Sequence, residues 1–281
     1  MAEILDGKML AGKMKDGFKL EVAELKQKGI HPKLAVIMVG EDPSSKIYVR
    51  NKSKDCEEVG IEYEEFFLKD TIKMKELLEL IESLNKRADI HGILLQSPIP
   101  KHLDIDLAFK TISPKKDVDG FNPVNVGKLV LNHDTFISCT PYGVIKLLEE
   151  YNIDLEGKHA VVIGRSNIVG KPMALCLLHK NATVTICHSK TKDLDAITKT
   201  ADILIAAIGK PKFIKKEMVK ENAVVIDVGI SRLDDGTILG DVDFDEVSKI
   251  AGYITKVPGG VGPMTRAMLL NNIVRAAKRK L

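Results

Sequence analysis

The sequence predicts an α/β protein with two domains, each built on a parallel sheet, and a cleft between them. Two series of apolar, strand-like runs alternate with helix-like segments along the 281 residues. A polar stretch rich in Pro, Gly, Asn and Asp separates the two series at residues 113–132. Alternating strands and helices form parallel sheets through right-handed crossovers, and ligands bind beyond the carboxyl ends of the strands.

The first series accounts for the N-terminal domain. Short apolar runs predict strands, and wider apolar spacing predicts helices. A long helix at residues 6–28 precedes the series and covers one face of its sheet. The expected strands are residues 33–40, 61–68 and 89–96, and the expected connecting helices are residues 44–59 and 73–86.

The second series follows residues 113–132, which show no helical periodicity and are therefore the expected domain boundary. A helix is expected from Thr140, with Pro141 at an early helical position. A long amphipathic helix at residues 262–281 closes the chain, and its apolar face needs a surface to cover. The expected strands are residues 159–164, 182–187, 202–209 and 223–229.

Composition excludes several classes of function. The formal charge of +3 comes from scattered residues, so it does not favour nucleic acid as a partner. The sequence has neither a signal-peptide pattern nor an apolar run of about 18 residues, which predicts a cytoplasmic protein without a membrane partner. The four cysteines form no C-x-x-C pair, so neither a metal site nor a disulfide framework is expected.

The stretch VVIGRSNIVGKP resembles a dinucleotide fingerprint with altered glycine positions. Gly164 ends a predicted strand and a helix is expected after Gly170, but Ser166 and Val169 occupy the second and third glycine positions. In this context a phosphate-binding loop competes with an ordinary tight turn. The flanking strands predict a Rossmann-like second domain.

The next strand favours NADP as the cofactor. The sequence HSKT follows residues 182–187, where NAD-binding proteins have an acidic residue for the ribose hydroxyl. Ser189, Lys190 and Arg165 could donate hydrogen bonds to a 2′-phosphate, which a carboxylate would repel.

Polar residues of the first domain form a second candidate site. Tyr48 and Lys52 lie four residues apart on a predicted helix, Gln96 ends a predicted strand, and Asp119 lies in the polar crossing. Together they offer an aromatic face, an amine that can act as a base if desolvated, an amide and a carboxylate. A solvated helix face is the alternative for the first two residues. The loop VPGGVGP, just before a helix, is a further candidate for ligand contact.

Six stretches, in this order, resemble the bifunctional methylenetetrahydrofolate dehydrogenase/methenyltetrahydrofolate cyclohydrolase family. They are YVRNKSKDCEEVGI, GILLQSPIP, PKKDVDGFNPVNVGKL, CTPYGVIKLLE, VVIGRSNIVGKP and VPGGVGPMT. The resemblance covers almost the whole chain. Ser97, where the family commonly has leucine, and Arg87, where it usually has an acidic residue, are departures.

The resemblance implies an activity and a division of the chain. NADP accepts a hydride from 5,10-methylenetetrahydrofolate, and the methenyl product is hydrolysed to 10-formyltetrahydrofolate. Residues 1–120 are expected to form the folate-binding catalytic domain, with the helix at 266–281 packing back on it. Residues 121–265 are expected to form the Rossmann-like NADP-binding domain, and the protein is expected to be a homodimer.

The resemblance also implies roles for matching residues. Lys52 is the expected general base or proton shuttle, held by Gln96, while Tyr48 stacks on the folate and Asp119 binds its pterin. These four are the expected catalytic residues, and Tyr48, Gln96 and Asp119 also bind substrate. The expected NADP contacts are Gly164, Arg165, Ser166, Ser189 and Ile230, and the expected folate-side loop is Pro258, Gly259 and Gly260.

Alternatives from other classes remain open at this point. A NADP-dependent dehydrogenase of another substrate, without cyclohydrolase activity, would share the second domain but would not need Tyr48, Lys52, Gln96 and Asp119 together. A non-catalytic folate- or nucleotide-binding module would bind without turnover. A serine or cysteine hydrolase is disfavoured because no G-x-S-x-G sequence occurs.

Overall fold

The computed structural model describes residues 1–233 and 235–279, and it consists of two compact units. We call them the three-stranded unit, which comprises Lys13–Ile137 with Arg266–Leu281, and the six-stranded unit, which comprises Met1–Gly12 with Ser138–Thr265. Each is named for the larger sheet among its described residues. Both sheets are parallel, as the sequence predicts.

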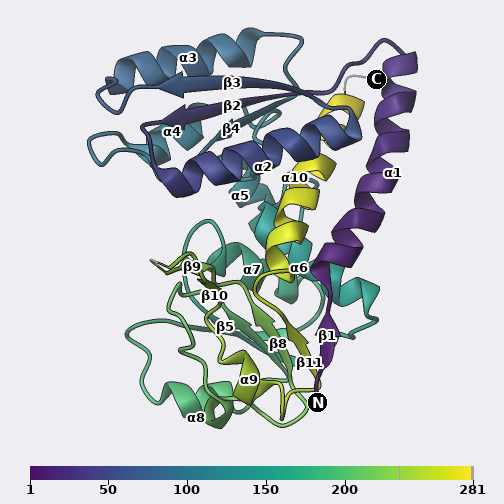
Figure 1. Ribbon diagram of the computed structural model, residues 1–281, viewed down its shortest axis with the longest axis vertical. Helices are drawn as coiled ribbons and strands as arrows, with labels where there is room; N and C mark the ends of the chain where they lie inside the picture. The colour runs from purple at the N-terminus through teal and green to yellow at the C-terminus, as the bar shows by residue number, and fades with distance from the viewer. Residues whose placement is uncertain (234, 280–281) are drawn as a thin grey trace. The chain divides into compact units, whose positions relative to one another are not determined.

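The sheet of the three-stranded unit has the order β3-β2-β4 (Figure 1). Its strands are β2 (Lys33–Val39), β3 (Glu62–Leu68) and β4 (Gly92–Leu95). Its helices are α2 (Pro43–Val59), α3 (Met74–Lys86), α4 (Ile105–Thr111) and α5 (Pro123–Val130), with most of α1 (Gly7–Gln27) and of α10 (Val261–Lys278). Residues 280 and 281, the end of the last predicted helix, lie outside the described residues.

Alternate residues of β2 show why this sheet is buried on both faces. Ala35, Ile37 and Val39 pack with the buried stripe of α3, which repeats at helical spacing as Leu77, Ile81 and Leu84. The intervening residues of β2 are buried too. A parallel strand that is covered on both sides reads as a continuous apolar run, as KLAVIMV does.

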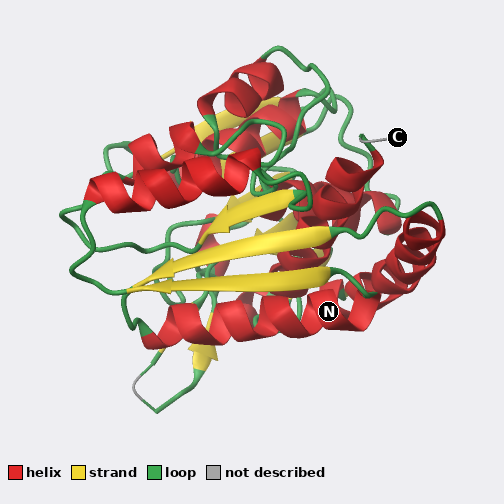
Figure 2. Cartoon of the chain, turned by 90° about the horizontal axis from the view of Figure 1, so that it is seen from above, coloured by secondary structure: helices red, strands yellow, loops and turns green. Residues whose placement is uncertain are grey.

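The sheet of the six-stranded unit has the order β1-β11-β8-β7-β5-β6. Its strands are β1 (Glu3–Leu5), β5 (His159–Ile163), β6 (Thr183–Cys187), β7 (Ile203–Ala206), β8 (Val224–Asp227) and β11 (Tyr253–Thr255). A short ribbon joins β9 (Ser231–Arg232) to β10 (Ile238–Leu239). The helices are α6 (Cys139–Glu150), α7 (Gly170–Leu178), α8 (Leu194–Thr198), α9 (Phe244–Val247) and the 3-10 helix η1 (Lys216–Met218). Figure 2 draws the helices of the chain in red and the strands in yellow.

Three features differ from the sequence-based expectation. The N-terminal residues form strand β1, which pairs with β11 and so places Met1–Gly12 in the six-stranded unit (Figure 1). The crossing at residues 113–132 contains helix α5, which Asn122 caps by accepting a hydrogen bond from Val124 N. The units divide at Ile137 and Ser138, later than the expected boundary at 120 and 121, because residues 121–137 pack with the three-stranded unit.

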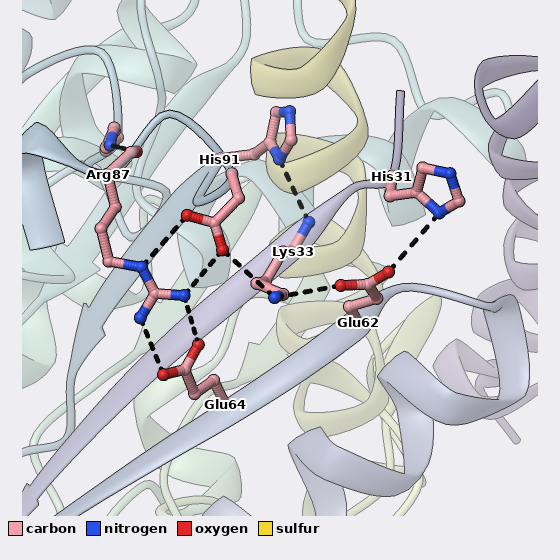
Figure 3. A network of polar contacts seen from close by, with 8 residues as sticks. His31, Lys33, Glu62, Glu64, Arg87 and His91 are labelled. Carbon is pink, nitrogen blue, oxygen red and sulfur yellow. Dashed lines mark hydrogen bonds and ion pairs between the residues drawn. The ribbon is translucent and has the colours of Figure 1, made fainter. Parts of the chain in front are cut away.

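Arg87, one of the departures from the family pattern, belongs to a charged network (Figure 3). Its guanidinium donates to both carboxylate oxygens of Glu64 at 2.8 Å and to Asp89 at 2.6 and 3.1 Å. Lys33 joins Asp89 to Glu62. Lys33 and Glu62 begin their strands, whereas Gln96 follows the other end of β4, so Arg87 is part of a surface network remote from the candidate site.

Within the described part of the chain, no helix combines the length and the apolar character that crossing a membrane requires.

Candidate active site

The ammonium group of Lys52 and the amide of Gln96 meet in the three-stranded unit. Lys52 lies on α2, Gln96 directly follows β4, and Lys52 Nζ donates to Gln96 Oε1 at 3.0 Å. Gln96 is buried, with 8% of its surface exposed, and Lys52 is half-buried. The structure thus brings together two residues that lie 44 positions apart in the chain.

The orientation of the Gln96 amide is determined by its own contacts. Its Nε2 group donates to the carbonyl of Ser97 at 2.7 Å, and its backbone N–H donates to Ile37 O at 2.8 Å. Because Ser97 O can only accept, the amide oxygen must be the atom that faces Lys52. Ser97, the second departure from the family pattern, acts here through its backbone, which any residue can supply.

Helix α2 holds Tyr48 one turn before Lys52. Asp42 caps the helix by accepting from Ser45 N at 2.7 Å, and Gly60 ends it in the left-handed conformation with φ of 81°. Residues four apart share a helix face. Tyr48 is 39% exposed, which leaves its ring accessible to a ligand on the face that carries Lys52.

Asp119 lies in a segment that the buried carboxylate of Asp117 organises. Asp117 accepts from the backbone N–H groups of Phe121 and Asn122, at 3.1 and 2.8 Å, and from the Asn125 amide at 2.8 Å. Burial raises the pKa of Asp117 to about 6, and the charge of Asp119 acts in the same direction. Sequence reasoning missed Asp117, although the repeated aspartates of DVDG were a signal for one buried and one accessible carboxylate.

The same segment runs beside β4. Ile93 and Asp117 form a parallel bridge, and Ile93 N donates to Lys116 O at 2.8 Å. Because the pairing is parallel, residue 119 follows in the direction in which β4 leads to Gln96. Asp119 is half-buried there.

The altered glycine loop of the six-stranded unit is a compact turn between β5 and α7. Gly164 has φ of 129°, and a Cβ atom on it would lie 2.3 Å from Ala207 O. A Cβ atom on Gly170 would lie 2.3 Å from Gly164 O. These two glycines are therefore required by close backbone packing.

Ser166 occupies a glycine position of the fingerprint, and its hydroxyl accepts hydrogen bonds from backbone N–H groups where α7 begins. Its Oγ accepts from Val169 N at 3.1 Å and from Gly170 N at 3.2 Å. The side chains of Arg165 and Ser166 are exposed beside this helix start. A cation and a helix N-terminus together favour an anion.

The HSKT segment follows β6, the strand next to β5. His188 N donates to Thr191 Oγ1 at 2.8 Å, and Lys190 N donates to His188 Nδ1 at 3.1 Å. Ser189 and Lys190 are exposed on the turn that these bonds order. Because β5 and β6 are adjacent and parallel, this turn and the glycine loop lie at the same edge of the sheet.

Two other predicted loops belong to the same unit. Ile230 follows β8 and is 45% exposed. In the loop before α10, Gly260 N donates to Lys256 O at 2.8 Å and Gly259 O accepts from Lys8 N at 2.8 Å, while Pro258 is exposed. Gly259 has φ of 114°, a value that favours glycine.

Comparison with known proteins accounts for both units. Residues 5–119 match the model of the tetrahydrofolate dehydrogenase/cyclohydrolase catalytic domain, and residues 138–281 match the NAD(P)-binding domain of the same family. The bifunctional protein FolD of Campylobacter concisus is 57% identical over 279 residues, which cover 99% of each chain.

Solved structures agree with these matches. The bifunctional methylenetetrahydrofolate dehydrogenase/cyclohydrolase of Campylobacter jejuni is 54% identical, with a TM-score of 0.99 and full coverage of both chains. The Trypanosoma brucei enzyme, complexed with NADP and an inhibitor, is 37% identical, with a TM-score of 0.96 over 99% of this chain and 98% of that one.

Proposed function

The chain belongs to the tetrahydrofolate dehydrogenase/cyclohydrolase family, and from this premise we propose which of its residues perform the two reactions. It is a bifunctional enzyme of one-carbon metabolism, which oxidises 5,10-methylenetetrahydrofolate with NADP and hydrolyses the methenyl product to 10-formyltetrahydrofolate. The observation that carries the residue assignment is the bond from Lys52 Nζ to Gln96 Oε1 at 3.0 Å.

Lys52 is the proposed proton-transfer group of the hydrolysis. A lysine amine with its ordinary pKa of about 10.4 is protonated at neutral pH, so it needs a nearby cation or desolvation to act as a base. The methenyl substrate carries such a positive charge. Neutral Lys52 accepts a proton from the attacking water and returns it to the folate nitrogen that leaves when the ring opens, while the hydroxyl of the water adduct loses its proton to solvent as the formyl C=O forms.

Gln96 keeps the Lys52 amine aligned through this proton cycle. Its Oε1 atom accepts from either the ammonium or the neutral amine, because both retain N–H groups. Its Nε2 group is committed to Ser97 O, so the amide cannot turn to offer a donor instead. The Gln96 Oε1 lone pair therefore keeps pointing at the Lys52 nitrogen whether that nitrogen is charged or neutral.

Tyr48 and Asp119 are the proposed folate contacts. The half-exposed ring of Tyr48 offers an aromatic face beside Lys52. The Asp119 carboxylate can accept paired N–H donors from the amino-pyrimidine edge of the pterin, and the hydrogen bonds to Asp117 hold its segment in place. The loop at Pro258, Gly259 and Gly260 is the proposed third folate contact.

The six-stranded unit offers residues that fit NADP. Close packing at Gly164 and Gly170 keeps the loop before α7 compact, and the exposed Arg165 and Ser166 on this loop are proposed to contact the dinucleotide. Arg165, Ser189 and Lys190 are the proposed donors to the 2′-phosphate, and Ile230 is a proposed apolar contact. When bound, NADP+ accepts the hydride, so the protein has to position the reactants and keep water away.

A homodimer is the proposed assembly. Among the described residues β3 lies at the edge of its sheet, and Phe67 on that strand is 60% exposed. An exposed edge strand with a large apolar side chain is a surface that a second copy can cover. Light scattering of the purified protein would give twice the mass of the 31.0 kDa chain if this proposal holds.

A cytoplasmic location is also proposed. The four cysteines are free and buried. Burial raises the pKa of the Cys56 thiol to about 12, and that of the Cys176 thiol to about 12. Thiols that remain protonated and unpaired fit a reducing compartment.

An assay with 5,10-methylenetetrahydrofolate tests the function directly. NADPH and the methenyl intermediate are followed separately, in parallel reactions with NADP+ and NAD+. We expect reduction of NADP+ in preference to NAD+, with little methenyl accumulation. Lasting accumulation would contradict the cyclohydrolase role of Lys52, and reduction of neither cofactor would contradict the dehydrogenase activity.

A further inference from the structure

Two buried aspartates of the six-stranded unit have no role in the function proposed above. Asp227 ends β8 and is 4% exposed, and Asp241 follows β10 and is 0% exposed. Burying a carboxylate without partners costs folding free energy, so the hydrogen-bond partners of these two aspartates indicate their role.

The carboxylate of Asp241 holds the loop that follows β7. Its Oδ2 atom accepts from Ile208 N at 2.7 Å and from Gly209 N at 3.0 Å, and its Oδ1 atom accepts from Lys210 N at 2.7 Å. Three consecutive backbone N–H groups therefore point at one side chain. This arrangement fixes the shape of a turn that has no strand partner for those donors.

Asp227 holds Asp241 in turn. Its Oδ1 atom accepts from Gly229 N at 3.0 Å and from Asp241 N at 2.9 Å, and its Oδ2 atom accepts from Val242 N at 2.9 Å. Its own N–H donates to Thr255 Oγ1 on β11 at 2.8 Å. The ends of β7, β8 and β11 are thereby linked through two carboxylates and one hydroxyl.

Two glycines allow this close arrangement. A Cβ atom on Gly229 would lie 2.2 Å from the Asp241 carboxylate, and one on Gly240 would lie 1.9 Å from Asp227 Oδ2. Each aspartate is thus packed directly against the backbone of the segment that carries the other. Neither segment can shift without displacing a carboxylate.

The loops held in this way border the proposed cofactor residues. Ala207, just before the N–H groups bound by Asp241, has its carbonyl 2.3 Å from where a Cβ on Gly164 would lie. Ile230 follows Gly229 directly. In the strand order β8-β7-β5-β6, the chain adds β6 on one side of β5 and then β7 and β8 on the other side. Nucleotides bind in the crevice that forms where the order of strands reverses in this way.

We propose that Asp227 and Asp241 are positioning residues, which hold the loops after β7 and β8 in the shape that binds NADP. The inference rests on the proposed cofactor site at Gly164 and Arg165. A role confined to general stability explains the arrangement less well, because apolar side chains fill a core at lower cost than two carboxylates. Burial raises the pKa of Asp227 to about 6, which is one sign of that cost.

The test compares Asp241→Asn with Asp243→Asn. An amide at position 241 turns one acceptor into a donor that faces backbone N–H groups, whereas Asp243 lies two residues away and pairs with Lys212 and Lys215. We expect Asp241→Asn to raise the Kd and KM for NADP+ at least about tenfold. Hydrolysis of methenyltetrahydrofolate without NADP should stay within about twofold, because Lys52 and Gln96 belong to the other unit.

Hydrogen–deuterium exchange gives a readout independent of activity. In Asp241→Asn the amides of residues 208–210 should exchange faster than in the parent, while Asp243→Asn leaves them unchanged. Asp241→Glu, which keeps the charge and displaces the carboxylate by one methylene, is the second variant if Asp241→Asn does not fold. It should shift NADP+ affinity in the same direction by a smaller factor.

Arg165→Ala separates failure of this inference from failure of the proposed function. If Arg165→Ala loses NADP+ affinity and Asp241→Asn binds NADP+ like the parent, the positioning role is wrong and the cofactor site stands. If neither variant changes the affinity for NADP+, both the proposed cofactor site at Arg165 and the positioning role of Asp241 are wrong. Equal loss of dehydrogenase and cyclohydrolase activity in Asp241→Asn and Asp241→Glu would assign Asp241 to general stability and overturn the positioning role.

Discussion

The two units prepare their sites in different ways. In the three-stranded unit one side-chain pair, Lys52 with Gln96, presents the proposed reactive group. In the six-stranded unit the candidate site is made mainly of loop backbone, shaped by Gly164 and Gly170 and held by Asp241. Chemistry in the first should therefore depend on single side-chain atoms, and binding in the second on the shape of several loops.

Replacing the lysine of the first unit should have the largest effect. Lys52→Met keeps the length of the side chain and removes the proton-transfer group, so we expect methenyltetrahydrofolate hydrolysis to fall at least about 100-fold. Folate and NADP binding should remain. The decay of methenyl absorbance measures the loss, with Lys54→Met on the exposed part of the same helix as the matched control. Hydrolysis by Lys52→Met at the parent rate would refute the role of Lys52.

Removing the cation of the glycine loop should have a smaller and more selective effect. Arg165→Ala is expected to weaken the binding of NADP+ roughly 10- to 100-fold and the binding of NAD+ much less, because a charged hydrogen bond to the 2′-phosphate is lost. Titration of both cofactors measures the two affinities. Lys180→Ala, which removes a surface lysine paired with Glu149 in the same unit, is the control. Equal losses for NADP+ and NAD+ would rule out a contact with the 2′-phosphate.

Two glycine substitutions compare the backbone of the two units. Gly170→Ala places a Cβ 2.3 Å from Gly164 O and should lower the free energy of unfolding by about 1–3 kcal/mol. Gly127→Ala, in α5 with no atom within 4 Å of the added Cβ, should raise it by about 0.5–1 kcal/mol. Denaturant unfolding measures both. Equal effects on the free energy of unfolding would show that close packing does not distinguish the two glycine positions.

The smallest expected effect concerns the charged network around Arg87. The Arg87 guanidinium, with Lys33, holds the pKa of Asp89 well below its usual range. Since ionised Asp89 is favoured in the folded state, its contribution is present above about pH 4 and is lost as the pH falls further. Asp89 is half exposed, so the contribution should be below about 1 kcal/mol.

Unfolding of the parent and of Asp89→Asn from pH 7 to pH 2 measures this contribution. The difference in the free energy of unfolding between the two proteins should be largest at neutral pH and should shrink steadily as the pH falls from about 4 to 2. A difference that grows as the pH falls would contradict the assigned sign. Asp106→Asn, which changes an exposed carboxylate of α4, is the control.

Local patterns predicted most of the strands and helices, because the spacing of apolar residues in each segment matches either a strand or a helix but not both. The run KLAVIMV became β2, and the helical stripe of Leu77, Ile81 and Leu84 became the buried side of α3. Strand β1 was missed because its three residues gain their stability from pairing with β11, about 250 positions away. Helix α5 was missed because its Pro and Asn residues read as a loop, although they occupy the first turn and the cap.

The amino-acid sequence alone determined the alternation of strands and helices, the positions of the turn glycines and the residue types available for proton transfer and anion binding. These properties depend on period, backbone freedom and side-chain chemistry, which are local. Only the tertiary structure decided that Lys52 meets Gln96 and that Asp241 faces the N–H groups of residues 208–210. Such contacts join residues tens of positions apart, and the packing of separate strands and helices sets their distances.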